Sequence, residues 1–493
     1  MLTAAILIPL LGALGYALIP RVPTGMLRPV AIAVATVPLL LLIGVWTTFD
    51  PSGPLFQAVE SVPWIPTVGA SFTLGVDGIA LPLAVMTALL FIAAIAFPVE
   101  DDGRLPAYLA WMLFLEAVSI GLFLALDLLL FYVFFDLSLV GMYFLIARWG
   151  HGDPKRAAMK FFLYTLIGSL VLLLGILSLA LAGEAVTFDL RTLIDTQPLA
   201  GQGLRAGLTL FAVLFGFAIK TPLVPVHTWL PAAHVDAPGP GSTILAGVLL
   251  KMGVFGMIRI AYAPMADTFG RYAIWLGGFA VLSIIWGALV ALGQTDMKRR
   301  IAYTSITHMG YSVLGIAVAG IAGAGQAHRL AIAGATLEMV AHGLIAGALF
   351  LITGAVWSRA HGYEMSRFGG LASKAPQLTG AAMLASFASL GLPGLAGFVA
   401  EFQIFTGALA VAPILAGLAL VGVLLTAALF LQMLQQVFLG DTPADLGEFP
   451  ELATRELIPL VLLLLPVVII GIAPAFLIDP MSATADALAT MVS

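Results

Sequence analysis

Six ionisable side chains lie within long apolar stretches of the sequence, where a charge is costly. They are Asp136, Lys220, Lys251, His308, His342 and Glu401. At about 1.5 Å of rise per residue from the start of each predicted helix, the first five lie roughly 12–23 Å deep. Charged groups at such depth in a membrane mark ion or proton pathways by default. Together, these six residues predict a lateral row of groups that exchange protons.

The lysines of this row are suited to switching between two protonation states. Burial in hydrocarbon disfavours the ammonium, whereas a nearby carboxylate stabilises it. If Asp136 approaches Lys220, the pair holds a proton, and if Asp136 withdraws, Lys220 releases the proton toward Lys251. The two histidines suit intermediate steps because imidazole titrates near neutral pH, and Glu401 would deliver the proton to an exit. Such a relay needs no bound cofactor.

Each of these groups also has a structural interpretation, because a buried charge can form an ion pair and a lone histidine can be a packing residue. Three further charged groups lie nearer helix ends, where they can extend toward water: Glu116, Asp127 and Lys160. Three others lie in the link between Lys220 and Lys251 and are expected to bond backbone groups freed there: His227, His234 and Asp236.

The helices that position the row are interrupted in two places. Pro222 and Pro225 follow Lys220 closely. Proline removes an amide donor and clashes with the preceding turn, so the helix is predicted to break just after Lys220. Irregular backbone in a membrane survives only where protein or trapped water satisfies it. Gly391 and Pro393 predict a second break downstream. Paired broken segments in two halves of a chain indicate an inverted-repeat transporter.

The composition places the chain in a membrane. Of 493 residues, 61% are hydrophobic and 10% are charged, with a mean hydropathy of +1.09. A net charge of −5 without a basic stripe predicts no nucleic-acid partner. The absence of cysteine excludes disulfides, thiolate catalysis and iron–sulfur ligation within this chain. If the protein works with electrons, they flow elsewhere.

The apolar segments predict an all-α polytopic membrane protein with about fourteen transmembrane helices. The predicted spans are 2–20, 26–46, 77–98, 106–126, 127–149, 157–182, 205–222, 240–262, 269–292, 300–320, 329–357, 378–409, 412–438 and 456–478. Helices 7 and 12 contain the breaks, so spans 4–8 and 9–13 are expected to form inverted five-helix repeats. This divides the chain into 1–105 (helices 1–3 and an external loop), 106–262 (first repeat), 263–438 (second repeat) and 439–493 (loop and last helix).

The distribution of cations predicts the orientation. Most lysines and arginines lie in or beside the odd-numbered connections between spans, whereas the even-numbered connections hold four arginines: Arg191, Arg205, Arg271 and Arg329. By the positive-inside rule the odd connections face the cytoplasm. Both termini are therefore predicted on the non-cytoplasmic side.

Five stretches of the sequence resemble a known family. They are FFLYTLIGSLVLLLGIL (161–177), HTWLPAAHVDAPGPGSTILAGVLLKMGVFGMIR (227–259), DMKRRIAYTSITHMGY (296–311), AHGLIAGALFL (341–351) and GLPGLAGFVAEF (391–402). In these motifs the chain resembles the antiporter-like chain M of bacterial NADH-quinone oxidoreductase, respiratory complex I. The resemblance covers most of spans 4–12 and is weaker in spans 1–2, the loop 47–76 and the last span.

The resemblance implies a proton-pumping subunit of a bacterial inner membrane. It implies Lys220 as the lysine of the broken helix, Lys251 as the connecting lysine, the two histidines as bridging groups and Glu401 as the exit-side carboxylate. Asp136 departs from the family, which typically has glutamate there, so its pair with Lys220 is expected to be looser or bridged by water. NADH, flavin mononucleotide, iron–sulfur clusters and quinone would be handled by other subunits. The implied partners are other membrane-arm subunits, including neighbouring antiporter-like subunits, and lipids.

Three alternatives remain open. A subunit of a multisubunit sodium/proton antiporter would use the same lysines and would be distinguished by its genomic neighbours or by sodium-dependent proton flux. The corresponding subunit of a membrane-bound hydrogenase would again be identified by its neighbours. A passive membrane scaffold would move no ions, but such a bundle has no need of desolvated lysines.

Overall fold

The computed structural model describes residues 1–18, 23–99, 103–444 and 446–492, and helices account for most of them. The predicted end of the first span at residues 19–20 lies outside these ranges. The helices are α1 (Leu2–Leu18), α2 (Thr24–Thr47), α3 (Ala80–Ala96), α4 (Leu105–Leu124), α5 (Leu128–Trp149), α6 (Pro154–Ala180), α7 (Leu190–Thr196), α8 (Gly203–Lys220), α9 (Leu230–Asp236), α10 (Gly239–Ile244), α11 (Leu250–Gly256), α12 (Ala266–Leu292), α13 (Met297–Ala322), α14 (Gly325–Ala360), α15 (Leu371–Lys374), α16 (Pro376–Ser389), α17 (Ala396–Val411), α18 (Pro413–Met433), α19 (Thr454–Ile472) and α20 (Ala475–Val492).

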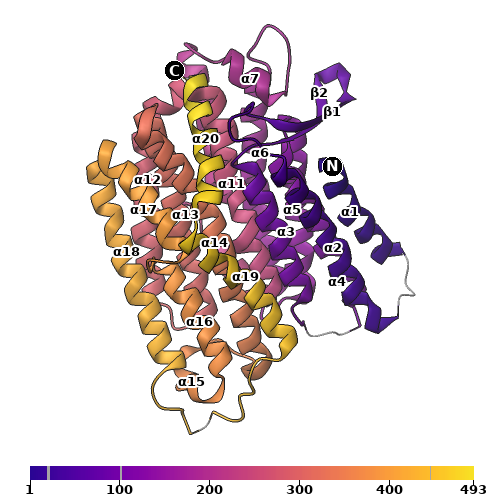
Figure 1. Cartoon of the computed structure of the whole chain (residues 1–493), viewed down its shortest axis with the longest axis vertical. Coiled ribbons are helices and arrows are strands. Elements are labelled where there is room, and N and C mark those ends of the chain that lie inside the picture. The colour runs from indigo at the N-terminus through magenta and orange to yellow at the C-terminus, as the bar shows by residue number, and fades with distance from the viewer. Residues whose placement is uncertain (19–22, 100–102, 445, 493) are drawn as a thin grey trace.

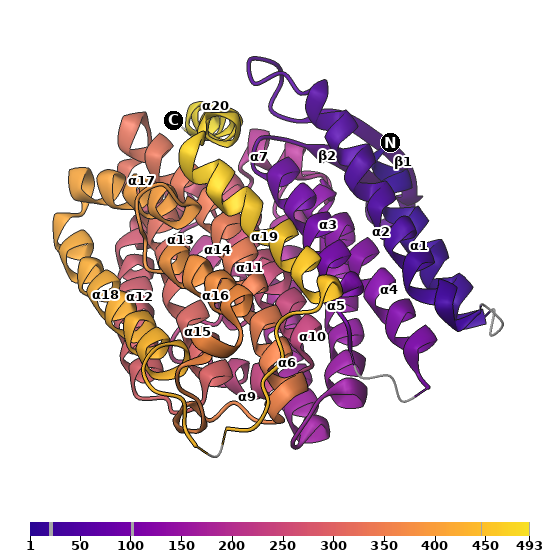
Figure 2. The same cartoon turned by 60° about the horizontal axis from the view of Figure 1, so that its bottom comes forward.

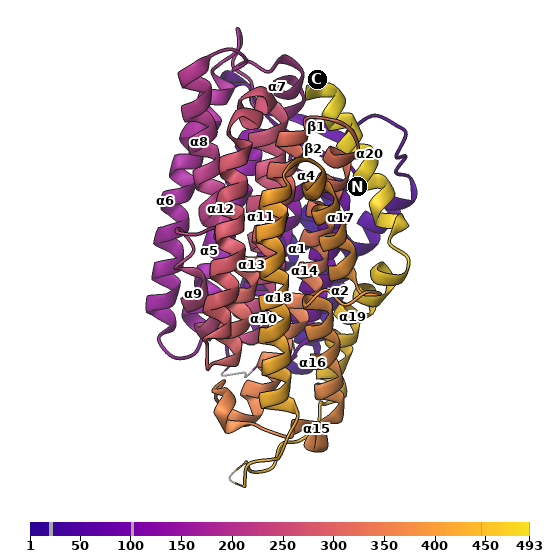
Figure 3. The ribbon, with the colours of Figure 1, turned by 90° about the vertical axis from the view of Figure 1, so that its left-hand side faces the viewer.

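The helical membrane architecture is confirmed. Ten helical stretches of the described residues are long and apolar enough to cross a membrane, and one of them, Gly239–Leu292, covers two predicted spans. Three shorter apolar helices, α1, α3 and α17, fall within other predicted spans. The long helices run roughly parallel, with α7 near one end and α15 at the other (Figure 3). The count of fourteen and the division into two repeats stay predictions.

Aspartate side chains begin several of these helices. Asp127 accepts hydrogen bonds from the amides of Leu129 and Leu130 and starts α5. Asp153, Asp189 and Asp296 cap α6, α7 and α13 in the same way. A capping carboxylate satisfies amides that have no partner within the helix. The turn predicted between spans 4 and 5 is thus where α4 ends and α5 begins.

Both predicted breaks are confirmed. The helix ends at Lys220 and resumes with α9 at Leu230. Within the link, the Val224 amide donates to the Ser283 hydroxyl at 2.9 Å and the Trp229 indole N–H donates to the Ile219 carbonyl at 2.9 Å. Protein groups therefore satisfy part of the backbone that the prolines free.

The second break separates α16 from α17 at residues 390–395. Gly391 adopts a φ of +80°, which residues with a side chain rarely adopt. A Cβ atom at this position would lie 2.7 Å from Oε2 of Glu401. Glycine is therefore needed here both for the turn and for the space beside the carboxyl group.

A β-hairpin is the exception to the helical architecture, and the sequence analysis did not predict it. Strands β1 (Gln57–Ile65) and β2 (Ala70–Val76) pair antiparallel within the predicted external loop. Figure 1 shows the hairpin near α7 and both chain ends at the same end of the bundle. Directly after β2, Asp77 forms a buried ion pair with Arg259 at 2.6 Å. This ion pair fixes the hairpin end of the chain to the helix that carries Lys251.

The bundle is a broad array rather than a round one. Viewed toward the opposite end, α1 and α2 lie at one edge, α12 and α18 lie at the other, and α11 and α14 lie between them (Figure 2). Helix α14 is the longest, with 36 residues, and most of it is buried. His342 of the predicted row therefore lies on a helix at the centre of the molecule.

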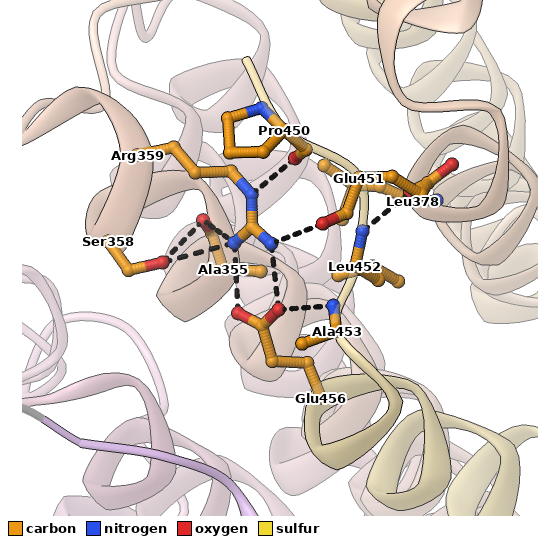
Figure 4. A network of polar contacts seen from close by, with 9 residues as sticks. All are labelled: Ala355, Ser358, Arg359, Leu378, Pro450, Glu451, Leu452, Ala453 and Glu456. Atoms are coloured by element: carbon orange, nitrogen blue, oxygen red, sulfur yellow. Dashed lines mark hydrogen bonds and ion pairs between the residues drawn. The ribbon is translucent and has the colours of Figure 1, made fainter. Parts of the chain in front are cut away.

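Near the end opposite the termini, Arg359 joins the end of α14 to the start of α19. Its guanidinium contacts both carboxylate oxygens of Glu456 at 2.7 and 2.9 Å, and it also donates to the carbonyls of Pro450 and Glu451 (Figure 4). A bidentate arginine–carboxylate pair fixes geometry as well as charge. This contact holds the long connection before α19 against the bundle.

Candidate functional site

Asp136 lies on α5 and is held by a hydroxyl group of the next helix. The Ser169 hydroxyl on α6 donates to Oδ1 of Asp136, and the Tyr132 hydroxyl lies 3.2 Å from Ser169 Oγ. Tyr132 and Asp136 are one turn apart, so they share a face of α5. Asp136 is only partly buried within this chain. Its carboxylate is thus directed toward α6 and remains accessible from the edge of the subunit.

Lys220 ends α8 in an almost fully buried position, with 1% of its surface exposed. Its ammonium donates to the Ser138 hydroxyl at 2.9 Å and lies 4.9 Å from the centroid of the Phe135 ring. Among the described residues, Lys220 forms no ion pair with Asp136 within 4 Å. The two groups lie close enough to interact electrostatically, but each is bound to a serine instead.

Lys251 lies in α11, directly after a π-helical turn at Leu245–Leu249. Its ammonium donates to the Ala246 carbonyl at 2.5 Å and lies 2.6 Å from Nδ1 of His342 on α14. A π turn changes the backbone hydrogen-bond pattern, and such turns occur frequently at functional sites. Lys251 and His342 therefore form the first direct link of the predicted row.

His308 on α13 lies close to side chains of three other helices, α14, α16 and α17. Its Nδ1 atom lies 3.1 Å from Oε1 of Glu338 and 3.9 Å from Oε1 of Glu401. Its Nε2 atom lies 2.9 Å from the Ser389 hydroxyl, at the end of α16. The His308 and His342 ring centroids are 5.1 Å apart. The structure thus brings Lys251, both histidines and Glu401 into one buried cluster.

Lys220 and Asp136 form a separate cluster, the first cluster. The groups from Lys251 to Glu401 are called the second cluster. No hydrogen bond in the described part of the chain joins the first cluster directly to Lys251. Aromatic rings pack together where α5, α8 and α11 meet, because Phe131 contacts both Phe217 and Phe255. The hydroxyl of Thr221 is buried there without a partner, close to Gly253 of α11. A proton crossing from Lys220 to Lys251 therefore needs water or a side-chain movement.

The sequence analysis missed Glu338. This residue is 1% exposed, contacts His308 and has its Oε2 atom without a hydrogen-bond partner. Its signal in the sequence is a carboxylate four residues before His342, which places both on one face of α14. A carboxylate at that spacing should have been included in the row.

Three structural interpretations made from the sequence are wrong. Glu116 does not extend toward water, because it is fully buried within α4 and neither carboxylate oxygen has a partner. His234 does not bond the freed backbone, because both ring nitrogens lack partners and its ring stacks on Phe350 with centroids 4.5 Å apart. Asp127 does not extend toward water either, because it is 1% exposed and caps α5.

A cavity of about 200 Å³ lies near the end of the bundle opposite the termini. Its lining includes Arg104, Arg148, His151 and Trp357. His151 is in the loop between α5 and α6, and its ring stacks on Trp357 at 4.2 Å. Burial, assisted by the charges of Lys298 and His361, lowers the pKa of His151 to about 4. His151 is therefore a neutral packing group at physiological pH.

The side chains of the site are of the kinds that exchange protons. Among the described residues, no group of three or more histidine, cysteine, aspartate or glutamate side chains is arranged to hold a metal ion. The second cluster instead alternates ammonium, imidazole and carboxylate groups at hydrogen-bonding distances. Such groups donate and accept protons without forming covalent intermediates.

Comparisons with known proteins show the family to which the chain is related. The transmembrane family described as NADH:quinone oxidoreductase/Mrp antiporter matches residues 125–426. The chain is 38% identical to "NAD(P)H-quinone oxidoreductase chain 4 1" of Picosynechococcus sp. over 96% of this chain and 89% of that protein. It is 36% identical to "NADH-quinone oxidoreductase subunit M" of Rickettsia conorii over 93% of this chain and 91% of that protein.

Solved structures show the same fold. A chain of respiratory complex I from Thermus thermophilus with bound NADH superposes with a TM-score of 0.89 at 29% identity, covering all of both chains. A chain of the Mrp complex from Dietzia sp. gives a TM-score of 0.86 at 22% identity, covering 99% of this chain and 96% of that one.

Proposed function

Because this chain belongs to the NADH:quinone oxidoreductase/Mrp antiporter transmembrane family, we propose that it is the antiporter-like, proton-translocating membrane subunit of a complex I type NADH:quinone oxidoreductase. The observation that carries the proposal is the buried cluster from Lys251 through His342 and His308 to Glu401. A passive scaffold would not need this buried cluster, because each buried charge costs free energy.

In the proposed mechanism, Asp136 controls the proton on Lys220. In one state, the Ser169 hydroxyl binds the Asp136 carboxylate and holds it away from Lys220. In the same state, the Lys220 ammonium donates a hydrogen bond to the Ser138 hydroxyl. When Asp136 turns toward Lys220, their attraction holds the proton there. When it turns back, Lys220 loses that stabilisation and releases the proton toward Lys251. The partial exposure of Asp136 is consistent with control from a neighbouring subunit.

Lys251 then passes the proton into the second cluster. His342 accepts at Nδ1 across 2.6 Å, and His308 connects this region to Glu401. Glu401 lies at the start of α17, beside the break after α16, where irregular backbone can admit water. It is assigned the release of the proton on the exit side. Asp136, Lys220, Lys251, His308, His342 and Glu401 thus keep their predicted roles.

The reaction that drives this movement is assigned to other subunits. Two curated relatives are named as parts of quinone oxidoreductases, and the Thermus thermophilus complex is described with bound NADH. We assign NADH, flavin mononucleotide, iron–sulfur clusters and quinone to partner subunits, and neighbouring membrane-arm subunits and lipids to the edges of this chain. The proposed location is a bacterial inner membrane, with both termini on the non-cytoplasmic side.

A subunit of a multisubunit sodium/proton antiporter is the second candidate. The family description favours this candidate, and so does the similarity to the Mrp complex. At 22% identity, that similarity is evidence for the fold alone. The curated relatives at 36–38% identity carry oxidoreductase names instead. Purifying the complex and identifying its other subunits separates the two candidates, because only the oxidoreductase brings NADH-oxidising partners.

The central test is Lys220→Ala in the purified complex reconstituted into liposomes. We expect NADH:quinone electron transfer to persist in the presence of an uncoupler and the number of protons moved per electron to fall. Lys155→Ala is the matched control, because Lys155 is an exposed lysine in the first turn of α6. Full pumping by an assembled Lys220→Ala complex would contradict the proposal. Proton flux that requires sodium would favour the antiporter.

A further inference from the structure

Glu338 is a carboxylate that contacts the proposed relay but has no role in it so far. It lies on α14, one turn before His342, and Oε1 lies 3.1 Å from Nδ1 of His308. Its charge also acts on the Lys251 ammonium. Within the described chain, Glu338 therefore lies between the lysine that begins the second cluster and the histidine that leads to Glu401.

A purely structural ion pair does not account for this geometry. A buried carboxylate that only stabilises the fold needs partners for both oxygens, because an unsatisfied buried charge is destabilising. Within the residues that the structure describes, Oε2 of Glu338 has no hydrogen-bond partner, and neither has Nε2 of His342, one turn further along the same helix face. Two unpartnered polar atoms on adjacent turns can be joined by one water or by a side-chain rotation.

Two carboxylates also compete for one nitrogen. His308 Nδ1 lies 3.1 Å from Glu338 and 3.9 Å from Glu401, so it makes a hydrogen bond to the first only. Like charges so close together in a dry interior cannot both remain ionised without a shared proton. A rotation of the His308 imidazole would move its Nδ1 atom from the Glu338 carboxylate to the Glu401 carboxylate.

We propose that Glu338 is a further proton-carrying residue of this relay, placed between Lys251 with His342 and His308 with Glu401. The inference rests on the proposed function. The proton leaves the Lys251 ammonium for Nδ1 of His342, whose Nε2 proton passes to the Glu338 carboxylate. The resulting carboxylic acid gives its proton to Nδ1 of neutral His308. Each step moves one proton and no electrons.

The final transfer uses the second carboxylate. While Nδ1 of His308 accepts the proton, its Nε2–H donates to the Ser389 hydroxyl, which keeps the ring in the required tautomer. The imidazolium then releases the Nδ1 proton to Glu401. The groups that face Glu338 throughout are Lys251 from α11, His308 and Tyr311 from α13, His342 from α14 and Glu401 from α17.

The test compares Glu338→Gln with Glu338→Asp in the reconstituted complex. Glutamine keeps the size and hydrogen bonds of the side chain but cannot carry a proton, so the protons moved per electron should fall to the value of Lys220→Ala. Aspartate should recover at least part of this loss. Thr336→Val is the control, because Thr336 is a buried polar residue of the same helix that bonds only its own backbone.

The outcomes separate this inference from the proposed function. Normal pumping by Glu338→Gln alongside impaired Lys220→Ala overturns the role of Glu338 and leaves the proposed function intact. Normal pumping by both variants overturns the proposed function. As a second measurement, redox-induced infrared difference spectra should contain a protonated-carboxyl band that shifts in Glu338→Asp. Spectra of the wild type and the assembled Glu338→Asp complex that are identical in this region would overturn the inference.

Discussion

Replacing Arg359 with alanine should release the connection between α18 and α19. The Arg359 and Glu456 side chains are each only 7% exposed, so the variant leaves a buried carboxylate without its cation. Removing one partner of a buried ion pair costs about 3–5 kcal/mol. The carbonyls of Pro450 and Glu451 lose their donor as well. At about 1.4 kcal/mol per tenfold change, local opening should become roughly 10²- to 4 × 10³-fold more frequent.

Limited proteolysis measures this opening directly. Glu448 is exposed in the connection, so a protease that cleaves after glutamate can report on it in the detergent-purified complex. When closing is faster than cleavage, the cleavage rate follows the population of the open form. Arg359→Lys is the conservative control, because lysine keeps the charge and loses the bidentate geometry. Its cleavage rate should lie between those of the wild type and Arg359→Ala.

The double variant Arg359→Met with Glu456→Leu tests the reasoning itself. If the cost comes from the uncompensated carboxylate, removing both charges should restore much of the protection that Arg359→Ala loses. A cleavage rate for Arg359→Ala within threefold of the wild type would refute the account. So would a double variant that is cleaved faster than Arg359→Ala, because the loss would then arise from packing.

Three further outcomes are expected. Burial lowers the pKa of His151 to about 4 from an ordinary 6.5. Between these two pH values the unfolded chain therefore binds more protons than the folded chain. The free energy of unfolding should consequently fall as the pH drops from 6.5 toward 4. In His151→Phe, which can still stack on Trp357, melting temperatures should show a flatter dependence on pH in that window. Asp136→Asn should reduce pumping far more than Asp136→Glu, and equal behaviour of the two would show that the charge does not matter. A reporter fused at Asp153 should signal the cytoplasm, and an external signal would overturn the orientation.

The local sequence was sufficient to predict where the helices break. Pro222 and Pro225 remove backbone donors directly after Lys220, and Gly391 supplies a conformation that other residues avoid, so both interruptions follow from covalent geometry. The start of α5 at Asp127 likewise follows from a capping side chain. These features depend on neighbours within a few residues of the chain.

The contacts of the site could not be predicted in the same way. The spacing of Glu338 and His342 shows that they share a face of α14, but not that His308 of α13 lies against that face. Likewise, nothing near Asp136 in the sequence indicates that Ser169 would bind its carboxylate in place of Lys220. Such contacts depend on how the helices pack, which apolar sequences specify only weakly because most of their surfaces are chemically alike.

The missing side chain of Gly391 has a consequence for the carboxyl group beside it. Position 391 borders the space in which Glu401 can rotate, since a Cβ atom there would lie 2.7 Å from Oε2 of this residue. Any replacement of this glycine would therefore both strain the bend between α16 and α17 and crowd the acid at the proposed outlet.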